Sequence, residues 1–301
     1  MLHKPVLLKE VVGYLNLKLG DTVLDATING GGHAEKIVER IGNDGTLIGI
    51  DQDAVILEKL KLKIKNLKFK DNVVLINGNF RDLDKLLELL KIKKINGALF
   101  DLGMSSIQLE DSGRGFTFMK DEPLLMTYKS EIASSDLTAR DILNQWSEED
   151  LTQILFKYGE ERYARKIARA IIKKRKKKKI ETTTELKEII EKNVPPSYRH
   201  KKGISPVTKT FQALRITVND ELNALKEGVG KVWKIMKPGS RLVVISFHSL
   251  EDRIIKNFFK DKKNNGGGII LTKKPIVPSS EEIKINPKSR SAKLRAIEKI
   301  K

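Results

Sequence analysis

Between residues 21 and 101, short apolar runs alternate with longer amphipathic stretches, and few architectures accommodate that pattern. The apolar runs predict strands at residues 22–25, 46–51, 73–76 and 98–100. The stretches between them, at 33–41, 54–64 and 83–90, carry apolar side chains at the 3.6-residue period of helices that cover a sheet. Strands that alternate with helices in this way form a parallel sheet, so the sequence predicts an α/β fold.

The pattern changes after Asp101. Residues 109–204 contain no apolar strand-like run, but they contain helical patterns at 137–146, 149–158, 164–174 and 184–192. Strand character returns at 241–246, after a predicted turn at 237–239, and again near 268–272 and 293–297. We therefore expect one α/β domain formed by residues 1–108 and 205–301, interrupted by an inserted helical domain at 109–204.

Net charge indicates the class of partner. The chain of 301 residues carries 58 Lys and Arg against 39 Asp and Glu, a formal net charge of +19. Such a field favours polyanions, with nucleic acid first and an anionic membrane surface second. Seven consecutive basic residues, Lys173–Lys179, fall in the predicted insert. They are either a solvated helix end or a contact to phosphate.

Several classes of protein are excluded by composition. There is no cysteine, which excludes disulfides, thiolate zinc sites, iron–sulfur clusters and cysteine nucleophiles. There is no P-loop, which disfavours a nucleotide hydrolase. No apolar run approaches the length of a membrane span, and Glu10 interrupts the region where a signal peptide would be apolar. We therefore expect a cytoplasmic protein that does not enter the membrane.

A glycine-rich turn follows the first predicted strand. Gly30, Gly31 and Gly32 precede His33 and the first covering helix. Consecutive glycines let the backbone approach a ligand closely, and a helix N-terminus favours negative charge. A dinucleotide fingerprint would need Gly or Ala where Glu35 stands, which disfavours a nicotinamide cofactor.

Asp51 ends the second predicted strand, twenty residues after Gly31. A carboxylate at this place is positioned to accept hydrogen bonds from a ribose diol. The turn and the carboxylate together predict a cofactor that contains adenosine. S-adenosylmethionine (SAM) fits this pattern better than NAD.

The later strands end in polar loops. Ligands of an open parallel sheet lie beyond the carboxyl ends of its strands, so the loops at 77–80 and 101–106 are expected to face one crevice. Phe80 would either stack on an adenine ring or pack in the core, and Asp101 would lie near the reacting centre.

The loop after the strand at 241–246 supplies a further candidate. His248 lies where that strand ends, at the open edge of the sheet, and is a candidate for lining the site. Ser249 and Asp252 have the spacing of a capping box for the helix that follows.

Eight sequence blocks, found in order along nearly the whole chain, carry a family resemblance. They are KPVLL (4–8), GGGH (30–33), DLGMSSIQL (101–109), RGFTF (114–118), YGEER (158–162), TFQALRITVN (210–219), SFHSLEDR (246–253) and NPKSRSAKLR (286–295). In this order they resemble the RsmH/MraW family of SAM-dependent 16S rRNA cytidine-N4 methyltransferases.

The resemblance implies a class I SAM-dependent methyltransferase fold, Rossmann-like with a mostly parallel sheet, and an inserted helical domain for substrate recognition. It implies methylation of the N4 amine of a cytidine in the decoding region of 16S rRNA, in the small ribosomal subunit. The SAM contacts carried over by position are Gly31, Gly32, His33, Asp51, Phe80, Asp101 and Gln108. The oligomeric state, monomer or homodimer, stays open.

Three places depart from the family pattern. Asn29 stands where the family commonly has Gly, Leu125 and Thr127 replace the Asp and Arg of a PLDMRM block, and Ser205 begins a Ser-Pro-Val sequence in place of His-Pro-Ala. None of the departures falls on a predicted SAM contact.

The chemistry that the residues support is methylation of an amine. C5 methylation of a pyrimidine normally needs a cysteine to activate the ring, and a direct transfer to nitrogen needs an acceptor that orients the amine. Asp101, with Ser105 behind it, is the candidate catalytic pair, although Asp101 is equally placed to hold SAM. The alternatives are a DNA amino-methyltransferase, whose usual Asx/Ser-Pro-Pro-aromatic motif is absent after the fourth strand, and a non-enzymatic RNA-binding assembly factor.

Overall fold

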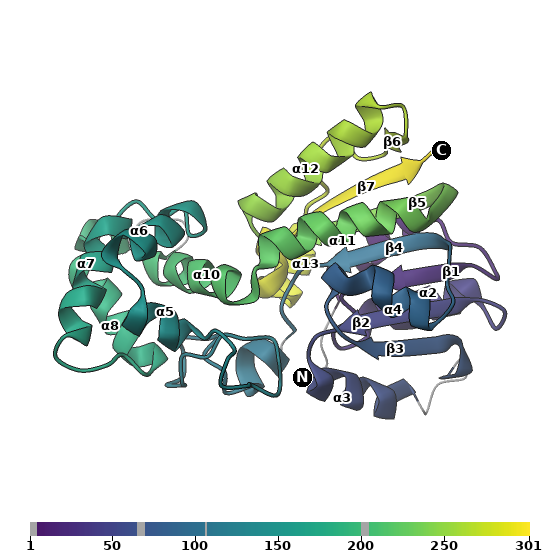
Figure 1. Ribbon diagram of the computed structural model, residues 1–301. Coiled ribbons are helices and arrows are strands. Elements are labelled where there is room, and N and C mark those ends of the chain that lie inside the picture. Colours follow the sequence, from purple (N-terminus) through teal and green to yellow (C-terminus); the bar gives the residue numbers. More distant parts are fainter. Residues whose placement is uncertain (1–4, 65–69, 106, 200–204) are drawn as a thin grey trace. The chain divides into compact units, whose positions relative to one another are not determined.

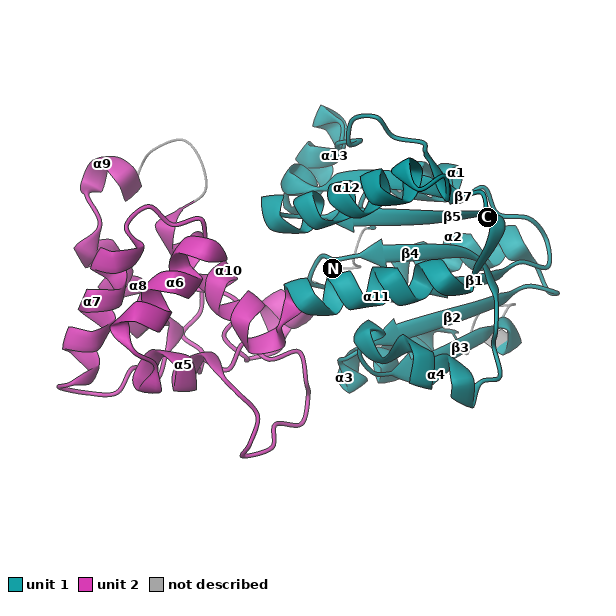
Figure 2. Cartoon of the chain, turned by 45° about the horizontal axis from the view of Figure 1, so that its top comes forward, with its two compact units in different colours: residues 1–105, 222–301 teal, residues 106–221 magenta. Residues whose placement is uncertain are grey.

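The computed structural model describes residues 5–64, 70–105, 107–199 and 205–301. The chain divides into two compact units (Figure 2). The first consists of residues 1–105 and 222–301, and the second of residues 106–221.

One seven-stranded sheet forms the centre of the first unit, in the order β3-β2-β1-β4-β5-β7-β6 (Figure 1). Strands β1 to β5 are parallel, whereas β7 runs antiparallel to both β5 and β6. The strands are β1 (Thr22–Asp25), β2 (Thr46–Asp51), β3 (Val73–Asn77), β4 (Ile95–Asp101), β5 (Met236–Ser246), β6 (Gly268–Ile270) and β7 (Lys293–Lys299). A mostly parallel sheet with a reversed seventh strand is that of the class I SAM-dependent methyltransferases, so the predicted fold class is confirmed.

Helices cover both faces of this sheet. Val23 and Leu24 are neighbours on β1 and both are fully buried, yet they belong to different cores because successive side chains of a strand point to opposite faces. The Val23 core is closed by α1 (Leu8–Leu15), α2 (Gly32–Ile41) and α3 (Ala54–Ile64). The Leu24 core is closed by α4 (Leu83–Leu89), α11 (Glu221–Ile235) and α12 (Ser249–Asn264). Shorter elements of the unit are α13 (Ser280–Ile285), η1 (Lys70–Asn72), η2 (Phe80–Asp82) and η4 (Pro287–Ser291).

The regular elements in the described part of the second unit are helices, and a long irregular segment at 112–138 lies between the first two of them. Its elements are η3 (Ile107–Asp111), α5 (Ala139–Gln145), α6 (Glu148–Lys157), α7 (Ala164–Arg175), α8 (Thr183–Asn193), α9 (Pro196–Arg199) and α10 (Pro206–Asn219). Capping boxes start two of these helices, Thr138 with Asp141 for α5 and Thr182 with Glu185 for α8. The helical patterns predicted between 137 and 192 are thus confirmed.

The basic run Lys173–Lys179 forms the end of α7 and the turn after it. Six of its side chains are exposed, and Arg175 is half-buried because it donates to the carbonyl of Leu143 (2.9 Å). Lys178 forms an ion pair with Glu185 (2.7 Å). The run therefore lies at a solvated helix end. Apart from Lys178, its five exposed lysines are available to a polyanion.

The boundaries of the compact units differ from those predicted for the domains. The second unit ends at Glu221, whereas we predicted that the insert ends at 204. Helix α10 packs against α5, α6 and α8, and Gln212 on it donates to the carbonyl of Tyr158 (2.9 Å). The periodicity of an amphipathic helix identifies its buried face but not the helices that cover it. The compact units group α10 with the helical segment, whereas the predicted domains group it with the α/β segment.

Two local predictions were wrong. The predicted turn at 237–239 lies inside β5, at a bulge. The register with β4 shifts between Ile95 and Gly97, and Gly239 in the bulge has a φ of 81°. The predicted capping box of Ser249 and Asp252 is displaced by one residue. His248 is the N-cap of α12, and Glu251 is its capping partner.

Among the helices in the described part of the chain, none has the length and apolarity needed to cross a membrane.

Candidate functional site

The glycine-rich turn joins β1 to α2 in the first unit. Gly31 is the N-cap of α2 with a φ of 75°, a left-handed conformation that glycine adopts without strain. A Cβ on Gly31 would lie 2.4 Å from the Leu60 side chain, and one on Gly32 would lie 3.0 Å from the ring of Pro5. The two glycines therefore allow α3 and the N-terminal segment to pack closely on this turn.

Asn29 shows why a departure from the family pattern is tolerated. Its φ is 48°, in the left-handed region where asparagine is the commonest residue after glycine. Its backbone N–H donates to Asp51 Oδ2 (3.0 Å), and its side-chain amide donates to the carbonyl of Gly103 (3.4 Å). Asn29 thus links the turn to the ends of β2 and β4.

Asp51 is buried at the carboxyl end of β2. Its Oδ1 accepts a hydrogen bond from the backbone N–H of Asp53 (2.9 Å), in addition to the bond from Asn29. Burial, opposed by these hydrogen bonds and reinforced by the charge of Asp53, raises the pKa of Asp51 to about 6. The carboxylate also accepts from the backbone N–H of Gln52 and still has lone-pair capacity beyond these three contacts, so the predicted bond to a ribose diol is compatible with its surroundings.

Asp25 is a second buried carboxyl group, at the end of β1, and we did not predict a role for it. Burial raises its pKa to about 8; the backbone N–H of Thr27 opposes the rise, and the charges of Asp101 and Asp51 add to it. The available signal was its place at the end of a central strand, which is the same signal that singled out Asp51 and Asp101.

Asp101 ends β4 beside these groups. Its backbone N–H donates to the Thr27 hydroxyl (2.6 Å), and its Oδ1 accepts from the N–H of Gly103 (3.4 Å). The structure thus brings together the three carboxyl groups of Asp25, Asp51 and Asp101 at one edge of the sheet. The charges of Asp51 and Asp101 both raise the pKa of buried Asp25, and a positive charge bound beside these carboxyl groups would relieve that repulsion, which suits a cationic ligand.

His33 completes this cluster from the first turn of α2. Its Nδ1 lies 3.6 Å from Asp101 Oδ2, and both side chains are more than nine-tenths buried. Its Nε2 lies 3.0 Å from the carbonyl of Val6. Burial, opposed by the bond to Val6 and the charge of Glu282, lowers the pKa of His33 to about 4, so the ring is neutral at neutral pH.

The N-terminal segment that supplies Val6 is itself held in place. The N–H of Leu7 donates to Glu282 Oε1 on α13 (2.8 Å), across 275 residues of sequence. Leu7 is fully buried and has a φ of 52°, a strained conformation for leucine that its surroundings must maintain. Sequence patterns gave no indication of this contact.

Phe80 lies just after β3, in η2. Its ring packs edge-on against Phe100, with 5.3 Å between the centroids, and a Cβ on Gly228 would lie 2.6 Å from it. These contacts match a core aromatic, but the ring is only half-buried. Its stacking on adenine therefore stays a prediction.

Two further predicted site residues, Ser105 and Gln108, belong to different compact units. Ser105 is buried at the end of the first unit's first segment, four residues after Asp101. Gln108 is buried in η3 of the second unit. The contact of Gln108 with SAM stays a prediction.

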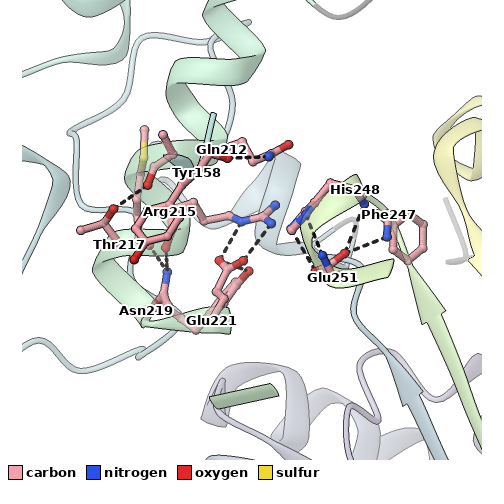
Figure 3. A network of polar contacts seen from close by, with 12 residues as sticks. Tyr158, Gln212, Arg215, Thr217, Asn219, Glu221, Phe247, His248 and Glu251 are labelled. Carbon is pink, nitrogen blue, oxygen red and sulfur yellow. Dashed lines mark hydrogen bonds and ion pairs between the residues drawn. The ribbon is translucent and has the colours of Figure 1, made fainter. Parts of the chain in front are cut away.

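His248 has a structural role at the start of α12. Its Nδ1 accepts from the N–H of Glu251 (3.4 Å), while the Glu251 carboxylate accepts from the N–H groups of Phe247 (2.8 Å) and His248 (3.2 Å), as Figure 3 shows. These bonds fix the turn that leaves β5. They do not test whether His248 lines the site.

A separate polar network lies within the second unit, at the end of α10. Arg215 and Glu221 form a two-bond ion pair, with distances of 2.8 and 3.0 Å (Figure 3). Tyr128 donates its hydroxyl to Glu221 (3.0 Å). Asn219 donates to the carbonyl of Met126 (2.8 Å). The network ties the end of α10 to the loop that holds Thr127.

Comparison with known proteins identifies the family of this chain. A sequence profile described as the MraW methylase family matches residues 1–300. A protein named ribosomal RNA small subunit methyltransferase H from Sulfurihydrogenibium sp. is 49% identical over 293 residues, 97% of each chain, and one of the same name from Persephonella marina is 46% identical over 298 residues, 99% of each chain. The crystal structure of an rRNA methylase from Streptococcus thermophilus aligns over 98% of this chain and 94% of that one, at 11% identity and a TM-score of 0.45. The match to the family extends over essentially the whole sequence, and the chain belongs to the MraW methylase family.

Proposed function

We propose that this protein is a SAM-dependent rRNA methyltransferase that acts on the N4 amine of a cytidine in the decoding region of 16S rRNA. One observation carries the proposal. In a chain that belongs to a methylase family, Asp25, Asp51 and Asp101 form a buried acidic cluster beside the glycine turn. The names of its relatives support rRNA of the small ribosomal subunit as the substrate.

The cluster fits SAM as its cofactor. The positive charges of the sulfonium and the ammonium group of SAM suit a site with several buried carboxyl groups, and its ribose suits Asp51. When bound, SAM would supply a methyl group on positively charged sulfur. The N4 lone pair would form the new C–N bond, the C–S bond would break to leave S-adenosylhomocysteine, and the methylated nitrogen would give up one proton to an acceptor beside it, for which Asp101 is the candidate. The residues that would hold SAM are Gly31, Gly32, His33, Asp51, Phe80, Asp101 and Gln108.

Asp101 and His33 form an acceptor pair in this proposal. The bond to Val6 requires the hydrogen of neutral His33 on Nε2, so Nδ1 presents a lone pair toward Asp101. Two acceptors 3.6 Å apart suit one donor group placed between them. That donor is either the ammonium group of SAM or the N4 amine of the cytidine, and Ser105 lies behind Asp101 in sequence.

The N4 amine needs a hydrogen-bond acceptor beside it to react, because its lone pair is delocalised into the ring. An acceptor beside the nitrogen turns the amine toward the methyl group and stabilises positive charge that develops on it. The lack of cysteine opposes the alternative transfer to C5. An amine product is therefore the chemistry that this chain supports best.

The partner in this proposal is 16S rRNA within the small ribosomal subunit, which places the protein in the cytoplasm. The helical insert, which we predicted at 109–204, would recognise the RNA, with exposed lysines of Lys173–Lys179 as phosphate contacts.

The experiment is methyl transfer from labelled SAM to small ribosomal subunits, with duplex DNA as the competing substrate. The proposal expects label in the RNA and none in the DNA. Label in DNA would identify a DNA amino-methyltransferase. SAM binding without transfer to any substrate would favour a non-enzymatic assembly factor.

A further inference from the structure

Positive charge is distributed unevenly along the sequence. Residues 222–301 contain 19 Lys and Arg against 7 Asp and Glu, a net charge of +12, whereas residues 106–221 have a net charge of only +5. Most of the excess charge therefore belongs to the C-terminal part of the first unit and not to the helical unit.

Four exposed basic residues of this part lie at the carboxyl edge of the sheet. Arg253 and Lys256 are in the first two turns of α12, which starts three residues after β5 ends. Lys288 and Arg290 are in η4, directly before β7. We call these four residues the edge cluster.

Register and side-chain contacts fix this placement. Lys293, the first residue of β7, pairs with Ser246, the last residue of β5, so η4 lies at the edge where β5 ends. Arg295 forms a two-bond ion pair with Asp252, at 2.6 and 3.1 Å, which ties β7 to the first turn of α12. Both halves of the edge cluster are thus attached to the end of β5.

Four acidic residues lie near the edge cluster, and their contacts differ. Asp252 is paired with Arg295, Glu251 accepts from two backbone N–H groups at the start of α12, and Glu282 accepts from Leu7. Glu281 is the exposed acid on α13. A hydrogen bond from a backbone N–H leaves a carboxylate charged, so Glu251, Glu281 and Glu282 offset part of the field of the four basic residues, while Asp252 is balanced by Arg295.

We propose that the edge cluster binds phosphates of the RNA strand on either side of the target nucleotide. The inference rests on the proposed function. A base that receives a methyl group must reach the carboxyl edge, next to Asp101, so its own phosphate and the neighbouring phosphates must pass along the same edge. Basic residues there can contact those phosphates, whereas lysines at the amino edge cannot.

The test compares two variants with equal charge. Lys256→Gln with Arg290→Gln removes two charges from the edge cluster, and Lys234→Gln with Lys237→Gln removes two exposed charges at the amino end of β5. Binding of each to 16S rRNA is measured against salt concentration, together with SAM affinity and KM for small subunits.

We expect the edge variant to lose about 0.7 in the slope of log K against log salt for each phosphate contact removed. Its KM for RNA rises about tenfold, while kcat and SAM affinity stay at the wild-type values. The control variant keeps the wild-type slope. Equal slopes for the two variants would overturn the inference, and so would loss of binding to phosphatidylserine vesicles without loss of binding to RNA. Failure of the proposed function looks different, because the wild-type protein itself would then not methylate the RNA.

Discussion

His33 Nδ1 and Asp101 Oδ2 lie 3.6 Å apart, and each is held by a group on its far side. The carbonyl of Val6 fixes the imidazole, and the N–H of Gly103 and the hydroxyl of Thr27 fix the loop of Asp101. This relationship connects the first turn of α2 to the end of β4. Under the proposed function, these two side chains recognise one donor group together.

Asp51→Ala is expected to weaken SAM binding by about 1.5–3 kcal/mol, the range for the loss of charge-assisted hydrogen bonds. The carboxylate also accepts from Asn29 and Asp53, so its removal loosens the turn as well. Asp51→Asn keeps the shape and one acceptor and should show a smaller loss. Calorimetry measures both, with thermal melting as the control for folding; wild-type affinity in folded Asp51→Ala would contradict the assignment.

SAM affinity is expected to rise with pH. Asp25 and Asp51 have pKa values raised to about 8 and about 6, and a cationic ligand lowers both, so binding releases protons. The limit is about tenfold tighter binding per pH unit for each proton released. S-adenosylhomocysteine, whose sulfur is neutral, should show a weaker dependence.

The same shifts set the stability of the protein without cofactor. Because the two pKa values are raised on folding, their contribution to the free energy of unfolding is full below about 3.8 and is lost as pH rises through about 6 and then about 8.

For SAM binding, titration calorimetry in two buffers of different ionisation enthalpy counts the protons that are released. A SAM affinity that does not change between pH 5.5 and 8.5 would contradict the acidic cluster as its site.

Glu282→Ala is expected to weaken SAM binding by about 2- to 10-fold, the value of one hydrogen bond. Without Oε1, Leu7 loses the acceptor that holds its strained backbone, and Val6 no longer fixes His33. Glu282→Gln keeps an acceptor and should restore the affinity. Glu281→Ala, at the exposed neighbour on α13, is the matched control.

The ring nitrogens of His33 separate this role from general destabilisation. Their ¹⁵N shifts report the hydrogen on Nε2 in the wild type and a mixture of tautomers in Glu282→Ala. An unchanged spectrum and unchanged affinity would show that the contact only supports the fold.

Strand ends were the part of the site that the sequence could predict. Asp51 and Asp101 each follow an apolar run, and in a parallel sheet all such ends meet at one edge. Asp25 also ends a central strand, but we predicted no role for it. Asp51 was singled out by a second signal that Asp25 lacks, its distance of twenty residues from Gly31, which is typical of a carboxylate that binds ribose. The glycine turn was located correctly, but its glycines are also required by Leu60 and Pro5, which no local pattern indicates.

Contacts between distant segments could not be predicted. The bond from Leu7 to Glu282 and the packing of α10 in the second unit depend on tertiary structure and leave no periodic signal. The prediction of Ser249 as the N-cap of α12 was wrong for another reason. Ser249 is a better N-cap residue than histidine by propensity, but Glu251 accepts from two N–H groups one residue earlier and sets the helix start at His248.

Asp101→Asn is expected to lower methyl transfer by about 10²-fold or more while the fold is kept, because it removes a preorganised charge. If the loss lies wholly in SAM affinity, Asp101 binds the ammonium group of the cofactor. If it appears in kcat at saturating SAM, Asp101 acts on the N4 amine. Activity and affinity both at the wild-type level would remove Asp101 from the site.

The identity of the methylated nucleoside tests the central claim most directly. Small ribosomal subunits that lack the modification are incubated with the protein and labelled SAM, and the digested RNA is analysed by mass spectrometry against nucleoside standards. The account predicts label in N4-methylcytidine. Label in 5-methylcytidine, or in a methylated purine, would contradict it.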